Sequence, residues 1–361
     1  MEEKFNQDNK DFWKIIHYSR GKYGRKVRSI KDKENNLKVE TEEVLEVWRE
    51  HFKEKFKKSQ EPHIENWRIR REDSGDEAEE EEEIEEVEVE IAIQRMKNGN
   101  TAGEDMMTPE MVKAGGRVLI GKITELFQVA WHEGRISEDW QRNIIIPLHK
   151  KGDSSKCENY RAVCLTNVIA KIYSRVLERR LREHVEPDME EEQAGFRTGR
   201  QTQDHIFSIR TIIDKWLNRG KEVYLGFLDL HSAFDEVPRE ELWKALCKKK
   251  TPPKLMRAVQ SIFQKVQGVV RMDGKTSGTF DMERGIKQGD SLSPLLFIVF
   301  MDEILKTCKA RTKRSMVGRW NMRPVYAQAL VYADDISLIS DTENKLQTAV
   351  TEWMATLSER E

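Results

Sequence analysis

Two adjacent aspartates, Asp334 and Asp335, stand inside the apolar stretch LVYADDISLI at residues 330–339. Neighbouring carboxylates repel each other, and burying them is costly unless a positive charge lies between them. One explanation is a turn, because Asp is favoured in turns; however, a two-residue hairpin usually has Gly or Asn at its second central position, and Ile336 follows this pair. A bound divalent cation is the other explanation. From the pair alone, a turn and a metal site are equally open.

A third carboxylate, Asp229, ends the apolar run YLGFLD. If the two stretches are neighbouring strands of one sheet, the three carboxylates meet at one edge. Such a cluster is repulsive when empty and is well satisfied by two Mg²⁺ ions, which prefer oxygen ligands. Two metal ions roughly 3.5–4 Å apart can stabilise the attacking and leaving oxygens of a phosphoryl transfer. Three unrelated surface aspartates explain poorly why each lies beside Leu, Val, Ile or Phe.

The composition of the 361-residue chain excludes several classes of protein. No apolar run approaches the roughly 18 residues of a membrane span, and the N-terminus lacks the apolar core of a signal peptide, so we expect an intracellular protein without a membrane partner. The four cysteines are far apart and form no CxxC pair, which argues against a structural zinc. Outside an acidic block the chain is net basic, which suits a polyanionic partner.

The elements that must position these carboxylates are expected in the last of three regions. Residues 1–71 are predicted to be a helical extension, because VLEVWREHFKEKF places Val44, Trp48 and Phe52 near one face. Residues 72–90 carry 13 acidic residues and no basic one, which predicts an acidic linker whose end begins a helix. Residues 91–361 mix helices and short strands irregularly, which favours an α+β fold.

Several stretches of this third region, in this order, resemble the polymerase core of reverse transcriptases, and more narrowly that of LINE-type (non-LTR) retrotransposons of the RTE-like branch. They are MKNGNTAGED, EDWQRNIIIPLHKKGD, NYRAVCLTNVIAKIYSRVLERRL, QAGFRTGRQTQDHIF, FLDLHSAFDEVP, GIKQGDSLSPLLF and YADD. The resemblance implies a right-hand polymerase fold, with fingers and an antiparallel palm sheet. It also implies an RNA-directed DNA polymerase that adds dNTPs to a DNA primer on an RNA template, uses two Mg²⁺ ions (or Mn²⁺ in their place), and acts in the nucleus.

The resemblance also assigns catalytic roles by position. Asp229 and Asp334 resemble the two principal metal-binding carboxylates, with Asp335 the supporting third. Leu230 would contribute its backbone carbonyl to a metal ion. Phe234 stands where the family keeps an aromatic ring under the sugar, where it would collide with a 2′-hydroxyl; core packing is the alternative reading of this residue.

Five further residues resemble the family's dNTP-binding positions. Gln288 would contact the incoming nucleotide or the template base, and Gly289 would let the backbone approach closely there. Lys150, Lys151 and Arg161 resemble residues of the fingers that hold the triphosphate, where positive charge offsets developing negative charge.

Arg197 and Arg200, in GFRTGR, are expected to meet template phosphates. The arginine face of the helix in NVIAKIYSRVLERRLREHV could do the same or could simply be solvated. Relatives would continue beyond MATLSERE into a thumb, so the resemblance implies that this chain is truncated at its C-terminus. Three alternatives follow: a relic that binds nucleic acid without activity, an RNA-dependent RNA polymerase, which Phe234 and YADD disfavour, and a coiled-coil scaffold built on the N-terminal third.

Overall fold

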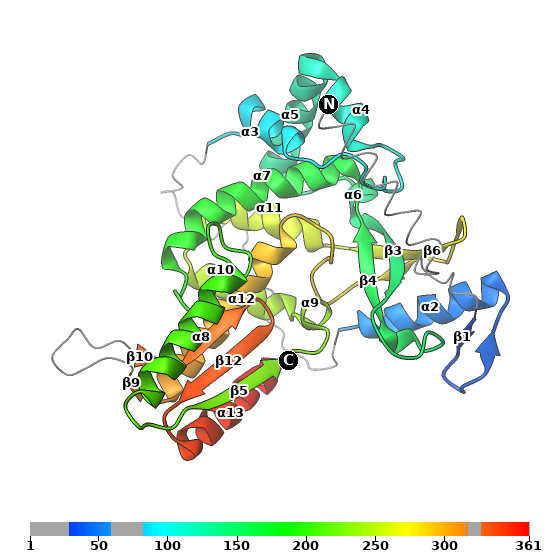
Figure 1. The fold of residues 1–361 in the computed structure, drawn as a ribbon. Coiled ribbons are helices and arrows are strands. Elements are labelled where there is room, and N and C mark those ends of the chain that lie inside the picture. The colour runs from blue at the N-terminus through cyan, green and yellow to red at the C-terminus, as the bar shows by residue number, and fades with distance from the viewer. Residues whose placement is uncertain (1–28, 59–81, 314, 317–325, 361) are drawn as a thin grey trace, which may run out of the picture.

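The computed structural model describes four stretches of the chain, which Figure 1 draws in colour: residues 29–58, 82–313, 315–316 and 326–360. Parts of the predicted N-terminal extension (1–28 and 59–71) and of the predicted acidic linker (72–81) lie outside the described residues. The described residues form two larger sheets and two small two-stranded ones, with helices packed around them. The predicted α+β class is confirmed at this level.

The first large sheet contains three strands in the order β11 (Ala329–Tyr332), β12 (Asp335–Ser340) and β5 (Tyr224–Asp229), all antiparallel. The two stretches that carry the aspartates are therefore neighbouring strands of one sheet, which is the arrangement that brings the carboxylates to one edge. In β12 the buried residues Ile336 and Leu338 alternate with Asp335 and Ser337, which fixes the register because a slip by one residue would turn the apolar set to the wrong face.

One face of this sheet packs on two helices, α12 (Ser293–Arg311) and α13 (Glu343–Ser358). Leu338 and Gly226 belong to this face: a Cβ added to Gly226 would lie 3.2 Å from Leu346 of α13. The strand and the helix therefore approach closely here.

The opposite face is covered only in part. Helix α8 (Thr202–Leu217) packs Trp216 against Leu225 and Ile339 at the far end of the strands. At the near end, Phe227 is 69% exposed and shares its face with Asp229, because both lie on β5 two residues apart. The sheet therefore presents an open surface at the end that carries the carboxylates.

The second large sheet is mixed. Its strands are β3 (Arg142–His149), β4 (Tyr160–Leu165), β6 (Gln267–Met272), β7 (Lys275–Thr276) and β8 (Phe280–Asp281). Strands β3 and β4 form an antiparallel hairpin, β6 runs parallel to β3, and the last two strands pair with β6.

Helix α2 (Thr41–Lys55) packs on this second sheet. Its Trp48 and Phe52 are fully buried, with rings stacked at 5.4 Å, in a core that also contains Ile145 and Val270. The described part of the predicted N-terminal extension thus shares a hydrophobic core with strands that lie far along the chain, since Ile145 and Val270 follow Phe52 by 93 and 218 residues.

The remaining helices complete the larger core. They are α3 (Glu86–Gln94), α4 (Pro109–Ala114), α5 (Gly116–Glu133), α6 (Glu138–Gln141), α7 (Val168–Val185), α9 (Ala233–Glu236), α10 (Arg239–Lys248) and α11 (Pro253–Phe263), with short 3-10 turns at Cys157–Asn159 and Glu186–Asp188. The two small sheets pair β1 (Ile30–Lys31) with β2 (Leu37–Lys38) and β9 (Ser315–Met316) with β10 (Tyr326–Ala327). None of the described helices has the length and apolar character needed to cross a membrane.

Candidate active site

The three aspartates come together at the open end of the three-stranded sheet. Asp229 and Asp335 are direct cross-strand partners, and Tyr332 pairs with Asp335 across the hairpin. Ala333 and Asp334 are therefore the two turn residues, and Ala333 adopts a left-handed backbone with φ of 57°. The turn explanation is right for Asp334, and the same turn brings its carboxylate beside the other two.

The loop at residues 193–196 supports this turn. Gln193 is fully buried, and its Oε1 accepts the backbone N–H groups of Gly195 at 2.8 Å and of Ala333 at 3.1 Å. Ala194 donates its N–H to the carbonyl of Val331 in β11 at 2.9 Å. A Cβ added to Gly195 would lie 2.2 Å from the nitrogen of Ala333, so only glycine fits. The loop thus fixes a left-handed alanine that would otherwise be strained.

The electrostatics of this edge are those of an uncompensated acidic cluster. Asp229 and Asp335 are exposed and Asp334 is half-buried, and within the described part of the chain none of the three makes a hydrogen bond or an ion pair through its side chain. Partial burial, followed by the charges of Asp334 and Asp229, raises the pKa of Asp335. The negative charges of Asp229 and Asp334 therefore disfavour the ionised form of Asp335.

A hard divalent cation fits this donor chemistry, because all three side chains offer carboxylate oxygens without a competing cation. As placed, the described residues contain no group of three His, Cys, Asp or Glu side chains close enough to hold a metal ion by themselves. An ion at this edge would therefore take further ligands from water or from substrate phosphates, which is the usual habit of Mg²⁺.

Leu230 and Phe234 follow Asp229 where the chain leaves the sheet. Both are half-buried against the main core. The ring of Phe234, in α9, stacks on Phe297 at 4.6 Å and meets Phe196 edge-on at 6.2 Å. Core packing therefore accounts for one face of Phe234.

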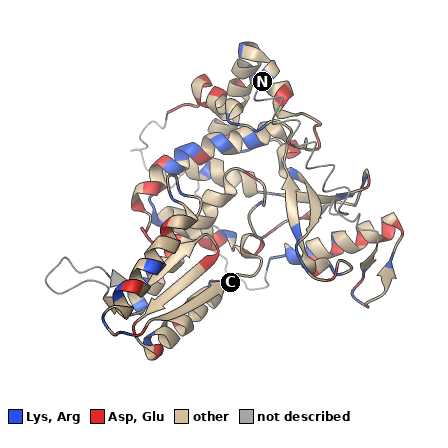
Figure 2. Ribbon diagram, viewed as in Figure 1, with Lys and Arg blue, Asp and Glu red and all other residues tan. Residues whose placement is uncertain are grey.

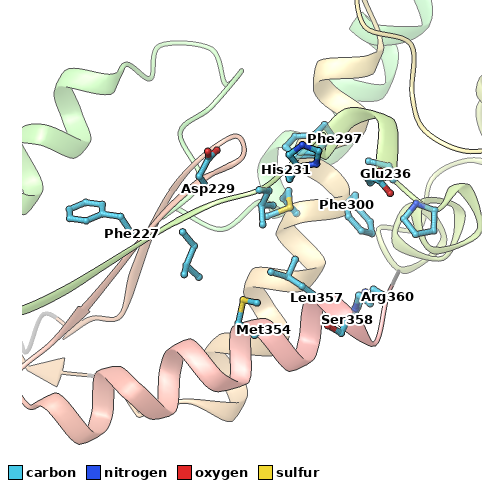
Figure 3. Close-up of a pocket in the computed structure, with 16 residues that line it drawn as sticks. Phe227, Asp229, His231, Glu236, Phe297, Phe300, Met354, Leu357, Ser358 and Arg360 are labelled. Atoms are coloured by element: carbon cyan, nitrogen blue, oxygen red, sulfur yellow. The ribbon is translucent and has the colours of Figure 1, made fainter. Parts of the chain in front are cut away.

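A pocket of about 400 Å³ lies beside the end of β5 that carries Asp229 (Figure 3). Its lining is mainly apolar and includes Phe300 of α12 together with Met354 and Leu357 of α13. Asp229 stands at its rim, with its carboxylate pointing away from α13 and toward the β11–β12 turn. The carboxylate of Asp229 therefore points away from the helix that forms one wall of this pocket.

Gln288 and Gly289 lie where their chain segment docks on β4. The Nε2 of Gln288 donates to Oδ1 of the buried Asp235 at 2.9 Å, and the Gln288 carbonyl accepts the N–H of Cys164 at 2.8 Å. Gly289 has φ of 109°, and a Cβ there would lie 2.8 Å from the Cys164 carbonyl oxygen. The close approach that requires glycine is thus an approach to β4.

The three cations expected to hold a triphosphate lie at the end of the β3–β4 hairpin. Lys150, Lys151 and Arg161 are all exposed, and none forms an ion pair within the described residues. Arg161 stands opposite Leu148 in the strand register, and the N–H of Lys150 donates to the carbonyl of Asn159 at 2.8 Å. The hairpin thus presents three cations to solvent on an ordered support.

The two arginines expected to contact the template, Arg197 and Arg200, are less exposed than the cations of the hairpin. Arg197 is only 9% exposed; its Nε is 2.7 Å from Oε1 of Glu186, and its NH1 donates to the carbonyls of Glu190 and Gln193. This guanidinium is used inside the protein and does not face solvent. Arg200 is half-buried and pairs with Glu191.

The arginine face of α7 is also committed to internal contacts. Arg175 donates to a backbone carbonyl, and Arg179, Arg180 and Arg182 form ion pairs with acidic side chains. The acidic partner of Arg180 is Glu88 of α3, at 2.6 Å. Figure 2 shows these basic residues along α7, where acidic residues lie beside them.

Sequence reasoning missed two residues that shape the site: Gln193, which supports the turn, and Asp235, which holds Gln288. Asp235 was present in the quoted AFDEV stretch as a carboxylate between Phe234 and Val237. That is the same signal, a charge among apolar residues, that identified Asp229.

Comparisons with known protein families, proteins and solved structures identify the family of this chain. Residues 148–361 match the family described as "Reverse transcriptase (RNA-dependent DNA polymerase)". The chain is 27% identical over 241 residues to the "Retrovirus-related Pol polyprotein from type-1 retrotransposable element R2" of Nasonia vitripennis, covering 66% of this chain and 22% of that protein. It is 25% identical over 220 residues to the "RNA-directed DNA polymerase from mobile element jockey" of Drosophila melanogaster, covering 60% and 24%.

Among solved structures, a Candida albicans telomerase with a fragment of telomeric RNA covers 67% of this chain and 44% of its own, at 13% identity and a TM-score of 0.45. The chain spans less than a quarter of the length of the two curated relatives. The RTE-like branch stays a prediction. Because the family match covers more than half of the chain and includes all three aspartates, the chain belongs to the reverse transcriptase family, among relatives from non-LTR retrotransposons.

Proposed function

We propose that this chain is the catalytic part of an RNA-directed DNA polymerase that extends a DNA primer on an RNA template. The observation that carries the proposal is the pairing of Asp229 with Asp335 across two strands, with Asp334 in the adjoining turn. In this proposal the three-stranded sheet is the palm, and the β3–β4 hairpin belongs to the fingers.

The reaction is attack of the primer 3′-oxygen on the α-phosphorus of a dNTP, which forms a phosphodiester bond and releases pyrophosphate. Asp229 and Asp334 would hold two Mg²⁺ ions, or Mn²⁺ in their place, with Asp335 and the Leu230 carbonyl in support. When bound, the ions stabilise the charge that develops on the attacking and leaving oxygens. The exposed end of the sheet beside Phe227 leaves room for a primer terminus to reach these carboxylates.

The remaining roles follow from the placement of each residue. Lys150, Lys151 and Arg161 are free to meet the triphosphate. Gln288 would contact the nucleotide or template base, with Gly289 seating its segment on β4. The half-buried ring of Phe234 would lie under the sugar.

Of the two arginines expected at the template, Arg200 keeps that role, by exchanging Glu191 for a phosphate. For Arg197 we propose instead a structural role in the loop that carries Gln193, because its side chain is buried and its Nε and NH1 already donate to Glu186, Glu190 and Gln193.

The test is Mg²⁺-dependent extension of a DNA primer on an RNA template, with dNTPs and rNTPs supplied separately. Asp334→Asn should slow extension by roughly two to three orders of magnitude, the usual cost of removing a group that stabilises developing charge. Asp214→Asn, at an exposed position on α8, is the matched control and should extend normally. A folded protein that binds primer–template in a salt-dependent way but never extends it would refute the proposal and favour a nucleic-acid-binding relic.

A further inference from the structure

An ion pair links the N-terminal helix to the segment that follows the catalytic strand. The Nζ of Lys55, the last residue of α2, lies 2.7 Å from Oδ2 of Asp235 in α9. The side chain of Asp235 is 3% exposed and that of Lys55 is 16% exposed, so water screens the pair only weakly. Burial raises the pKa of Asp235, and the charge of Lys55 opposes that rise. The ion pair with Lys55 thus favours the ionised form of this buried carboxylate.

The same carboxylate holds Gln288. Its second oxygen, Oδ1, accepts a hydrogen bond from Nε2 of Gln288 at 2.9 Å. An ionised carboxylate can only accept hydrogen bonds, so the amide of Gln288 must turn its NH₂ group toward Asp235 and its carbonyl oxygen away. A protonated Asp235 could instead donate to the amide oxygen, which would allow the amide to flip. The charge on Asp235 therefore decides which group of Gln288 faces outward.

The end of α2 is firmly seated, so it delivers Lys55 to a defined place. The carbonyl of Phe56 accepts the N–H groups of Glu283 at 2.9 Å and Arg284 at 3.2 Å, and Phe56 itself is buried. On the other side, Ile286 donates its N–H to the carbonyl of Phe234 at 2.9 Å. The short segment at residues 283–288 thus contacts the C-terminal end of α2 and helix α9, and it carries Gln288.

We propose that Lys55 is a positioning residue for nucleotide binding: by pairing with Asp235 it fixes the orientation of the Gln288 amide toward the incoming dNTP. This inference rests on the proposed function, because it assumes that Gln288 meets a nucleotide. It also makes α2 a part of the nucleotide site, although α2 lies outside residues 148–361, which match the family.

The experiment measures equilibrium binding of a dNTP to the protein on a primer–template whose primer ends in a dideoxynucleotide, so that no chemistry occurs. Lys55→Met should weaken dNTP binding about tenfold, the effect of one misdirected hydrogen bond. Primer–template affinity should stay unchanged. Lys53→Met, an exposed lysine on the same helix, is the control and should bind dNTP as the wild type does.

A double variant separates positioning from simple stability. Lys55→Met leaves a buried charge unpaired and lowers stability, and adding Asp235→Asn removes that charge and should restore the urea midpoint. The neutral amide at position 235 can both donate and accept, so it does not fix Gln288, and dNTP binding should stay weak. If dNTP affinity returned together with stability, or if Lys55→Met bound dNTP normally, the role would be structural and the inference wrong. A wild-type protein that bound primer–template but no dNTP would overturn the proposed function, and this inference with it.

Discussion

Replacing one of the paired carboxylates should stabilise the protein while removing its function. Asp229 and Asp335 are direct cross-strand partners. The Cβ atoms of such partners are about 5 Å apart, and two unit charges at about that distance in near-aqueous surroundings repel by about 0.8 kcal/mol. The charge of Asp334 adds a further repulsion, which ranks ahead of that of Asp229 among the causes that raise the pKa of Asp335. Asp335→Asn should therefore raise the free energy of unfolding by about 0.5–1 kcal/mol at neutral pH and low salt without divalent ions.

The pH dependence of this gain follows from the sign of the pKa shift. The pKa of Asp335 is raised in the folded protein by burial and by the two neighbouring carboxylates. Such a group favours folding below its ordinary pKa of 3.8 and loses that contribution as the pH rises through the folded-state value. The advantage of Asp335→Asn over the wild type should therefore be full at pH 7 and shrink as the pH falls toward 4.

Divalent ions should reverse the order of stability of the wild type and Asp335→Asn. An ion at 100 times its dissociation constant stabilises a folded protein by about 2.7 kcal/mol, so saturating Mg²⁺ should make the wild type the more stable protein. Urea denaturation in EDTA and in Mg²⁺ measures both effects, with Asp214→Asn as an exposed control expected to change stability by less than about 0.5 kcal/mol. If Asp335→Asn were less stable than wild type in EDTA, or if Mg²⁺ stabilised both proteins equally, the reasoning about this edge would be wrong.

Two further predictions concern the loop that supports the turn. Gln193→Met removes the acceptor for the N–H groups of Gly195 and Ala333 and should cost about 1–3 kcal/mol in urea denaturation. Gly195→Ala should cost at least about 2 kcal/mol, because its Cβ would lie 2.2 Å from a backbone nitrogen. Gly121→Ala is the control, because Gly121 lies inside α5 and faces only the flexible end of Glu86; it should raise the free energy of unfolding by about 0.5–1 kcal/mol. A loss of stability for Gly195→Ala and a gain for Gly121→Ala would confirm that the contact of Gly195 with the turn causes the loss.

The carboxylate edge could be predicted from the sequence because local pattern determines it. Asp229 ends the mainly apolar strand β5 and Asp335 begins the alternating strand β12, and a half-buried strand admits only one register. Once Asp229 and Asp335 end neighbouring strands, their proximity follows. The turn at Ala333 and Asp334 could not be placed by the same rule, because alanine rarely adopts a left-handed backbone and its support comes from Gln193, distant in sequence.

The burial of Arg197 could not be predicted from the sequence for a related reason. A basic residue in a loop with two glycines suggests an exposed phosphate contact, and the sequence offers nothing against it. Its burial depends on Glu186 and on two backbone carbonyls that come together only when the loop closes over the end of α7. Arg200, three residues later in the same loop, has one acidic partner and stays half-exposed. The difference between the two arginines is thus made by tertiary contacts.

Lys55 shows what kind of signal could have been used. In α2 the residues Leu45, Trp48 and Phe52 are buried at helical spacing, and Lys55 stands three residues further on the same stripe. A lysine at a position that should be apolar predicts a buried acidic partner, because an unpaired buried ammonium would lose its proton or unfold the helix end. Asp235, a carboxylate inside an apolar motif, makes the reciprocal prediction. With 62 basic and 64 acidic residues, the sequence supplies both halves of such pairs many times over. Only the docking of α2 beside the segment at residues 283–288 selects the pair of Lys55 and Asp235. The sequence near each residue therefore predicts that it needs a partner of opposite charge, whereas the tertiary fold determines which partner it meets.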